Sequence, residues 1–211
     1  EKPILHHALE LCKSYPFKKV VINTHYLADQ IEKSISQFRL ENPDFPEIIT
    51  VYEEELLETG GAIKNAIDIL GNKPLFTLNT DIIIKSEISL FDKLIKSWDM
   101  NKMEFLLLMH PTKEAVGYTG HGDFELELDG RISRPDISEN YKYVYAGLEI
   151  INPDRVARNP LRIFSLREYY LNSDRIYGIA VPNTRWYHAT SPEDLIEIEI
   201  DMLACERSDS K

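Results

Sequence analysis

Two stretches of the chain combine residue types that suit phosphate chemistry. One is Gly60–Gly61, a glycine pair that opens the amphipathic segment Ala62–Leu70, and the other is Leu75–Leu78, an apolar run followed closely by Asp81. In a parallel sheet, the start of a helix and the end of the next strand lie at the same edge. We therefore expect the free amides of the glycine pair to face an anion, and Asp81 to hold a cation beside it. Such a combination is typical of a nucleotide phosphate with its metal.

The composition narrows the class of protein. The chain has 211 residues and a formal net charge of -11, and it carries no basic stripe of the kind that binds nucleic acid. Cys12 and Cys205 lie near opposite ends and fit reduced thiols of a cytoplasmic protein. The apolar runs are too short to span a bilayer. We expect one domain over residues 1–211 that acts in the cytoplasm on small molecules, without nucleic acid or membrane.

Hydrophobic periodicity predicts the elements that must position these residues. Helices are expected at Pro3–Tyr15, Leu27–Phe38, Ala62–Leu70, Ser89–Trp98, Ser165–Leu171 and Pro192–Ala204, the last with Ser191 as N-cap. Strands are expected at Lys19–Asn23, Glu47–Tyr52, Leu75–Leu78, Glu104–His110, Asp123–Leu128, Tyr143–Ile151, Ile176–Val181 and Arg185–His188. The alternation of helices and strands in the first part of the chain indicates a doubly wound α/β fold.

One strand is missing from this order. In a doubly wound domain the first helix follows a strand in the middle of the sheet, and the chain as given begins with the helix. The two strands that should flank the missing one would be separated by roughly 10 Å. We therefore expect exposed strand edges, and association of the protein through them.

Several short motifs occur in a fixed order along the whole chain. They are Asn23–Leu27, Glu58–Ala62, Asn79–Asp81, Gly120–Phe124, Tyr145–Leu148, Trp186–His188 and Ser191–Leu195. Each is weakly specific alone, but their order and spacing resemble the sugar-nucleotide pyrophosphorylases, also called sugar-1-phosphate nucleotidyltransferases. The Gly-x-Gly-Asp-Phe loop most resembles the branch of N-acetylmuramate-1-phosphate uridylyltransferase and mannose-1-phosphate guanylyltransferase. The resemblance implies a Rossmann-like, GT-A-like α/β fold with a mixed, mostly parallel sheet flanked by helices.

The resemblance also implies a segment that this chain lacks. Members of the family open with a strand and a Gly-rich loop that carries an Arg and leads to a Pro-Lys-Pro segment, and these basic residues act on the leaving pyrophosphate. The present chain begins after that signature, and Lys2 is not assigned its role. We expect an N-terminally incomplete nucleotidyltransferase domain whose turnover by residues 1–211 alone is small.

Site residues are assigned by the resemblance. Asp81 is the catalytic residue, because it would bind the Mg²⁺ that bridges the nucleotide and the sugar phosphate. The expected nucleotide-binding residues are Glu58, Thr59, Gly60, Gly61 and Asn79, and the expected sugar-binding residues are Gly122, Asp123 and Gly147. Each also has a plainer explanation: an Asp often closes a strand-to-loop turn, a Gly often marks a hairpin or bulge, and Asn79 suits a structural hydrogen bond.

Position 188 departs from the family pattern. Many relatives carry an aspartate there as a second metal ligand, and this chain has His188. Mg²⁺ strongly prefers oxygen ligands, whereas Mn²⁺ accepts an imidazole more readily. We predict Asp81 and His188 as the metal ligands, with Mg²⁺ as the cofactor and Mn²⁺ as the alternative. A hydrogen bond from His188 to a phosphate, or a structural role beside Trp186, fits the sequence equally well.

The expected reaction is nucleotidyl transfer. An NTP and a sugar 1-phosphate would give an NDP-sugar and pyrophosphate, without a covalent enzyme intermediate. The sequence leaves open the sugar and the choice between UTP and GTP. The alternative is a truncated, inactive remnant that acts at most as a sugar-phosphate or protein-binding module.

Overall fold

The long strand β8 (Tyr143–Ile151) lies at the centre of the structure, a computed structural model that describes residues 2–134 and 140–209. Its side chains alternate between two apolar layers. On one side, Leu148 packs in a layer with helix α4 (Leu90–Ser97), and on the other, Tyr145 packs in a layer with α6 (Arg167–Asn172). Burial on both faces is typical of a central strand in an α/β domain.

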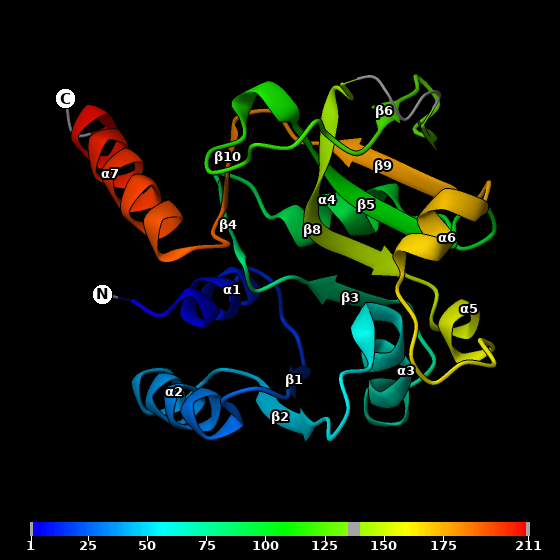
Figure 1. Cartoon of the computed structure of the whole chain (residues 1–211), viewed down its shortest axis with the longest axis horizontal. Helices are drawn as coiled ribbons and strands as arrows, with labels where there is room; N and C mark the ends of the chain where they lie inside the picture. The colour runs from blue at the N-terminus through cyan, green and yellow to red at the C-terminus, as the bar shows by residue number, and fades with distance from the viewer. Residues whose placement is uncertain (1, 135–139, 210–211) are drawn as a thin grey trace.

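The main sheet has the strand order β3–β8–β5–β9 (Figure 1). The other three strands of this sheet are β3 (Leu75–Leu78), β5 (Phe105–Pro111) and β9 (Ile176–Ala180). Strand β8 runs antiparallel to β3 and β5, and β5 runs parallel to β9. The predicted mixed sheet with flanking helices is confirmed, and β8 is the strand that introduces the antiparallel pairs.

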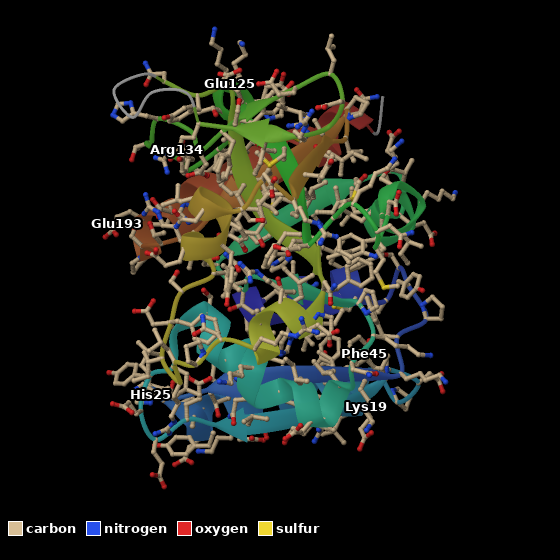
Figure 2. The ribbon with its side chains drawn as sticks, turned by 90° about the vertical axis from the view of Figure 1, so that its right-hand side faces the viewer. Lys19, His25, Phe45, Glu125, Arg134 and Glu193 are labelled. Carbon is tan, nitrogen blue, oxygen red and sulfur yellow. The ribbon has the colours of Figure 1, made fainter. Side chains whose placement is uncertain are left out.

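Three smaller strand pairs surround the main sheet. Strands β1 (Lys19–Thr24) and β2 (Glu47–Tyr52) pair in parallel, β4 (Ile82–Ser86) and β10 (Thr184–His188) pair antiparallel, and β6 (Glu125–Leu126) and β7 (Ile132–Ser133) form a short hairpin. Figure 2 shows Lys19, the first residue of β1, and His25, the residue after its end, on the opposite side of the molecule from Glu125 and Arg134. The β1–β2 pair is therefore remote from the β6–β7 hairpin.

The remaining helices lie around these sheets. They are α1 (Ile4–Cys12), α2 (Ala28–Glu41), α3 (Glu58–Leu70), α5 (Pro153–Ala157) and α7 (Pro192–Asp209), and a short 3-10 turn spans Thr112–Glu114. Helices α1 and α2 accompany the β1–β2 pair, and α7 extends away from the body at the C-terminal end of the chain (Figure 1). No helix in the described ranges combines the length and the apolar character needed to cross a membrane.

Local sequence explains where two of these helices begin. Ser89 accepts a hydrogen bond on its hydroxyl oxygen from the backbone N–H of Asp92 at 3.2 Å, which caps α4. Ser191 accepts the equivalent bond from Asp194 at 3.2 Å and caps α7. Both N-termini lie where the sequence predicts them, since a capping serine and an acid in the first turn are local signals.

The sequence pattern missed strand β4. Periodicity predicts no element between Leu78 and Ser89, yet Ile82–Ile84 are buried and pair with β10. Three consecutive β-branched residues were the available signal. Asp81 therefore lies in a short turn between β3 and β4, instead of at the end of an isolated strand. Helix α5 was also missed. Helix α3 begins at Glu58 instead of Ala62, so the glycine pair lies within the first turn of α3.

Open strand edges are present near the β1–β2 pair. Within the described ranges, β1 forms a ladder with β2 alone and β3 forms one with β8 alone. One edge of each strand therefore carries no ladder hydrogen bonds, as the sequence led us to expect. Association through these edges stays a prediction.

Candidate active site

Asp81 and His188 lie side by side at the end of the β4–β10 ladder. His188 pairs with Ile82, and the Asp81 carbonyl accepts a hydrogen bond from the Ala189 amide at 2.8 Å. The His188 Nε2 atom is 3.7 Å from the Asp81 Oδ2 atom. The Asp81 side chain is 49% exposed and that of His188 is 25% exposed, so both reach solvent. The ladder thus brings together the two predicted metal ligands.

The imidazole of His188 is held by aromatic neighbours. It stacks on Trp186 with ring centroids 5.5 Å apart and an interplanar angle of 12°. Trp186 is buried, donates a hydrogen bond from Nε1 to the Ala146 carbonyl at 3.0 Å, and also stacks on His110. The stack fixes the plane of the His188 ring, since Trp186 is itself anchored to the central strand β8.

Tyr118 connects this pair to the predicted sugar loop. Its ring lies 6.0 Å from that of His188, and the backbone of Gly122 faces its hydroxyl. Burial and the nearby charge of Asp123 raise the pKa of the Tyr118 hydroxyl. The neighbouring Gly117, at φ 73°, lies so close to the His188 carbonyl that a Cβ would be 2.4 Å from that oxygen. Sequence reasoning missed Tyr118, although an aromatic residue between glycines was a visible signal.

Asp123, Gly147 and Asn79 continue the same chain of contacts. The Asp123 Oδ2 atom accepts a hydrogen bond from the Tyr145 amide at 2.9 Å, and the Gly147 carbonyl accepts one from the Asn79 amide at 2.8 Å. Gly147 has φ 77°, and a Cβ there would lie 3.0 Å from Asn79 Cβ, so glycine is needed for this approach. Asn79 lies two residues before Asp81, so these contacts lead from the sugar loop back to Asp81.

Six of the predicted site residues therefore belong to one connected set. They are Asn79, Asp81, Gly122, Asp123, Gly147 and His188. Within this set, the backbone of Gly122 faces the Tyr118 hydroxyl. Its φ of 78° and its close approach to the Tyr141 carbonyl explain why glycine stands there. A sugar contact through this loop stays a prediction.

The glycine pair has a different environment. The amides of Gly60 and Gly61 both donate to the Phe164 carbonyl, at 2.9 and 3.1 Å. A Cβ on Gly60 would lie 2.3 Å from the Phe164 ring, and one on Gly61 would lie 2.3 Å from the Arg162 carbonyl oxygen. The prediction that these amides are free to face an anion is therefore wrong. The glycines permit close packing of the segment Arg162–Leu166 on the first turn of α3.

The other two residues of the predicted nucleotide segment differ from each other. The Thr59 hydroxyl oxygen accepts a hydrogen bond from the Leu166 amide at 2.9 Å, which adds to the packing of the same segment. Glu58 is exposed and has φ 62°, a strained backbone conformation for a non-glycine residue. Among the described residues, no hydrogen bond or ion pair joins this segment to Asp81. Nucleotide binding by Glu58–Gly61 stays a prediction.

A positively charged side chain, that of Arg134, lies beside the predicted sugar loop. Arg134 is half-buried, its guanidinium stacks over Tyr141 with 5.2 Å to the ring centroid, and its charge acts to lower the pKa of Tyr118. In an acidic protein, a basic side chain near the predicted sugar loop is suited to meet an anionic substrate group. Sequence reasoning did not single out Arg134, because an arginine in a turn is an ordinary surface residue.

A separate hollow lies where β1 and β2 end. It is lined by Thr24, His25, Ala28, Asp29, Glu32, Thr50 and Tyr52. None of the predicted site residues lines it, and its acidic side chains are poorly suited to a phosphate. The hollow therefore does not support the phosphate chemistry expected from the sequence.

Comparison with known proteins identifies the family. The chain is 31% identical over 202 residues to N-acetylmuramate alpha-1-phosphate uridylyltransferase of Caulobacter vibrioides, a match that covers 94% of this chain and 83% of that protein. The chain belongs to the sugar-nucleotide pyrophosphorylases. A protein of the same name from Neisseria meningitidis serogroup B is 25% identical over 156 residues, covering 72% of this chain and 63% of that protein. No family model matches the chain.

Solved structures support the pyrophosphorylase fold. A UDP-glucose pyrophosphorylase complexed with UDP-glucose superposes with a TM-score of 0.68 at 15% identity, covering 96% of this chain and 87% of that one. HddC from Yersinia pseudotuberculosis superposes with a TM-score of 0.70 at 19% identity, covering 90% of this chain and 82% of that one. At these identities the likeness shows the Rossmann-like fold alone.

The side chains of Asp81 and His188 offer two donor atoms to a divalent cation. One carboxylate oxygen and one imidazole nitrogen, 3.7 Å apart and both partly exposed, can approach the same divalent cation. Within the described ranges, no group of three or more His, Cys, Asp or Glu side chains is arranged to hold a metal. A cation here would therefore take its other ligands from phosphate oxygens and water, which suits a metal that binds together with a nucleotide.

Proposed function

We propose that this chain carries the nucleotidyl transfer of a sugar-1-phosphate uridylyltransferase, with N-acetylmuramate 1-phosphate as the sugar substrate. The single observation that carries the proposal is the connected set from Asp81 and His188, through Tyr118 and Asp123, to Gly147. That set joins the metal ligands predicted from the sequence to the predicted sugar loop. The 31% identical relative is named for this activity, which favours UTP over GTP.

The reaction needs positioning and charge neutralisation. An oxygen of the sugar phosphate attacks the α-phosphorus of UTP, the bond from that phosphorus to the bridging oxygen breaks, and pyrophosphate leaves. A divalent cation, Mg²⁺ or Mn²⁺, would neutralise the phosphate charge when bound. Asp81 and His188 would hold that cation, and the anchored ladder beneath them would keep both side chains in place during the reaction.

The sugar would lie on the side of Tyr118 and Gly147. The turn around Gly122 and Asp123 is fixed by the Tyr145 amide, so it presents a preformed wall. Arg134 supplies a positive charge beside this wall, and we propose that its guanidinium binds the anionic part of the sugar substrate. On the nucleotide side, the exposed Glu58 and the side chain of Asn79 are the groups available to contact base or ribose.

The test is turnover by the full-length protein. UTP and N-acetylmuramate 1-phosphate are incubated with the protein and either MgCl₂ or MnCl₂, and pyrophosphate release is followed. We expect release that depends on both substrates, and much slower release with GTP and mannose 1-phosphate. Faster release with the guanylyl pair would reassign base and sugar, and no release from the folded protein with either pair would favour the inactive remnant.

A further inference from the structure

The Asp81–His188 pair is held in place by the backbone. Backbone pairing between β4 and β10 sets the two residues next to each other, and the Ala189 amide fixes the Asp81 carbonyl. The 3.7 Å separation of Oδ2 and Nε2 is one that an ion about 2.1 Å from each atom can span. The partners are thus prearranged by main-chain hydrogen bonds, without a flexible loop between them.

The orientation of the imidazole is constrained as strongly as its position. Trp186 stacks against one face of His188, and Tyr118 lies at 60° to it. Trp186 is 2% exposed and hydrogen-bonded to β8, so its indole ring forms a rigid support. A histidine held in this way presents a fixed nitrogen donor, because neighbours that orient a metal ligand increase its affinity.

We propose that Asp81 and His188 together bind Mn²⁺ in preference to Mg²⁺, with the imidazole nitrogen as a direct ligand. The proposal rests on the proposed function, since it assigns the remaining coordination positions to phosphate oxygens. Mg²⁺ takes oxygen ligands almost exclusively, whereas Mn²⁺ combines carboxylate, phosphate and imidazole. Zn²⁺ fits less well, because zinc sites draw three or four ligands from the protein and this site offers two.

Binding of the metal alone gives a readout that does not depend on activity. The full-length protein is titrated with MnCl₂ while the EPR signal of free Mn²⁺ is followed, and MgCl₂ is added as competitor. We expect His188→Asp to lower the ratio of Mg²⁺ to Mn²⁺ dissociation constants by about tenfold. His188→Gln, which keeps the size and offers an oxygen, should do the same. His25→Gln removes an exposed histidine elsewhere and should leave the ratio unchanged.

Pulsed EPR of the Mn²⁺-loaded protein tests the ligand directly. We expect a ¹⁴N coupling in the wild type that is absent from His188→Asp and His188→Gln and present in His25→Gln. Circular dichroism establishes that each variant is folded. A wild type without ¹⁴N coupling, or a ratio that both His188 variants leave unchanged, would overturn the proposal.

Turnover separates this proposal from the function it rests on. Equal dissociation constants for Mg²⁺ and Mn²⁺, together with normal release of pyrophosphate, would overturn the manganese preference and leave the nucleotidyl transfer intact. His188-dependent Mn²⁺ binding with no pyrophosphate release under any metal would keep the metal assignment and remove the proposed reaction.

Discussion

The sequence predicts a ligand-binding role for both the glycine pair and the Asp81–His188 pair, but the two pairs have opposite environments in the structure. Asp81 and His188 keep their reactive atoms exposed at the end of a hydrogen-bonded ladder. Gly60 and Gly61 are buried under the segment Arg162–Leu166, and both amides donate to the Phe164 carbonyl. One pair is available to a ligand, and the other holds two parts of the fold together.

The difference shows what a motif can and cannot say. A carboxylate at the end of a strand has few partners nearby, so its oxygens tend to stay available. A glycine marks a place where something approaches the backbone closely, but it does not say whether that is a ligand or the protein itself. For Gly60–Gly61 the approaching atoms belong to the protein. The predictions below test this division from the largest expected effect to the smallest.

Removing the charge of Asp81 should have the largest effect. We expect Asp81→Asn to lower kcat of the full-length protein by about 10³-fold, because an amide neutralises less of the cation charge at the reacting phosphate. Pyrophosphate release under saturating substrates measures it. Asp68→Asn, an exposed position on α3, is the matched control and should retain full activity. Full activity of the Asp81→Asn protein would show that Asp81 has no catalytic role.

Glu149 lies beneath both regions and should make stability depend on pH. Its Oε1 atom accepts hydrogen bonds from Thr77, on the strand that leads to Asp81, and from Tyr170, on the helix after the segment that covers the glycine pair. Its Oε2 atom is buried without a partner among the described residues. Burial raises the pKa of Glu149 from 4.5 to about 7. Thr77, Tyr145 and Tyr170 face the carboxyl group, and within the described ranges no basic side chain forms an ion pair with it.

The raised pKa fixes the sign of the pH effect. The folded protein keeps a proton that the unfolded chain releases, so the contribution of Glu149 to stability is complete below about pH 4.5 and falls by about 3 kcal/mol as the pH rises to about 7. Glu149→Gln should abolish this fall, and denaturant unfolding between about pH 5 and pH 8 measures it. Glu168→Gln, an exposed change on α6, should keep the wild-type slope. Equal slopes for the wild type and Glu149→Gln would refute the assignment.

A methyl group on the glycine pair should cost stability and leave chemistry intact. In Gly61→Ala the new Cβ would lie 2.3 Å from the Arg162 carbonyl, which is main chain and cannot rotate away. We expect a loss of about 2–3 kcal/mol in the free energy of unfolding, with kcat of the folded protein unchanged. Asn65→Ala, an exposed change in the same helix, should stay within about 0.5 kcal/mol. Normal stability with a raised KM for the nucleotide would instead return the glycine pair to the binding site.

How much the sequence could reveal depended on the distance between partners along the chain. The extent of β3 and the start of α7 follow from local signals, the apolar run Leu75–Leu78 and the capping Ser191, so both were predictable. The hydrogen bond from the Gly60 amide to the Phe164 carbonyl and the ring contact between Tyr118 and His188 join segments that are distant in the sequence. Such contacts depend on how these segments pack, which no local pattern encodes. Strand β4 lay between these cases, because its three isoleucines follow a turn too short to separate it from β3.

The smallest effect should come from the exposed ion pair over the glycine pair. Arg162 Nη1 lies 3.5 Å from Glu55 Oε2, with side chains 70% and 59% exposed, so solvent screens most of the attraction. We expect Arg162→Gln to change the free energy of unfolding by less than about 0.5 kcal/mol, both at low salt and at high salt. Denaturant unfolding at two ionic strengths measures it. The contrary outcome is a large loss in the free energy of unfolding in Arg162→Gln, matched by an equal loss when salt is added to the wild type. It would mean that the ion pair, instead of the hydrogen bonds from the glycine amides to the Phe164 carbonyl, keeps the segment Arg162–Leu166 in place.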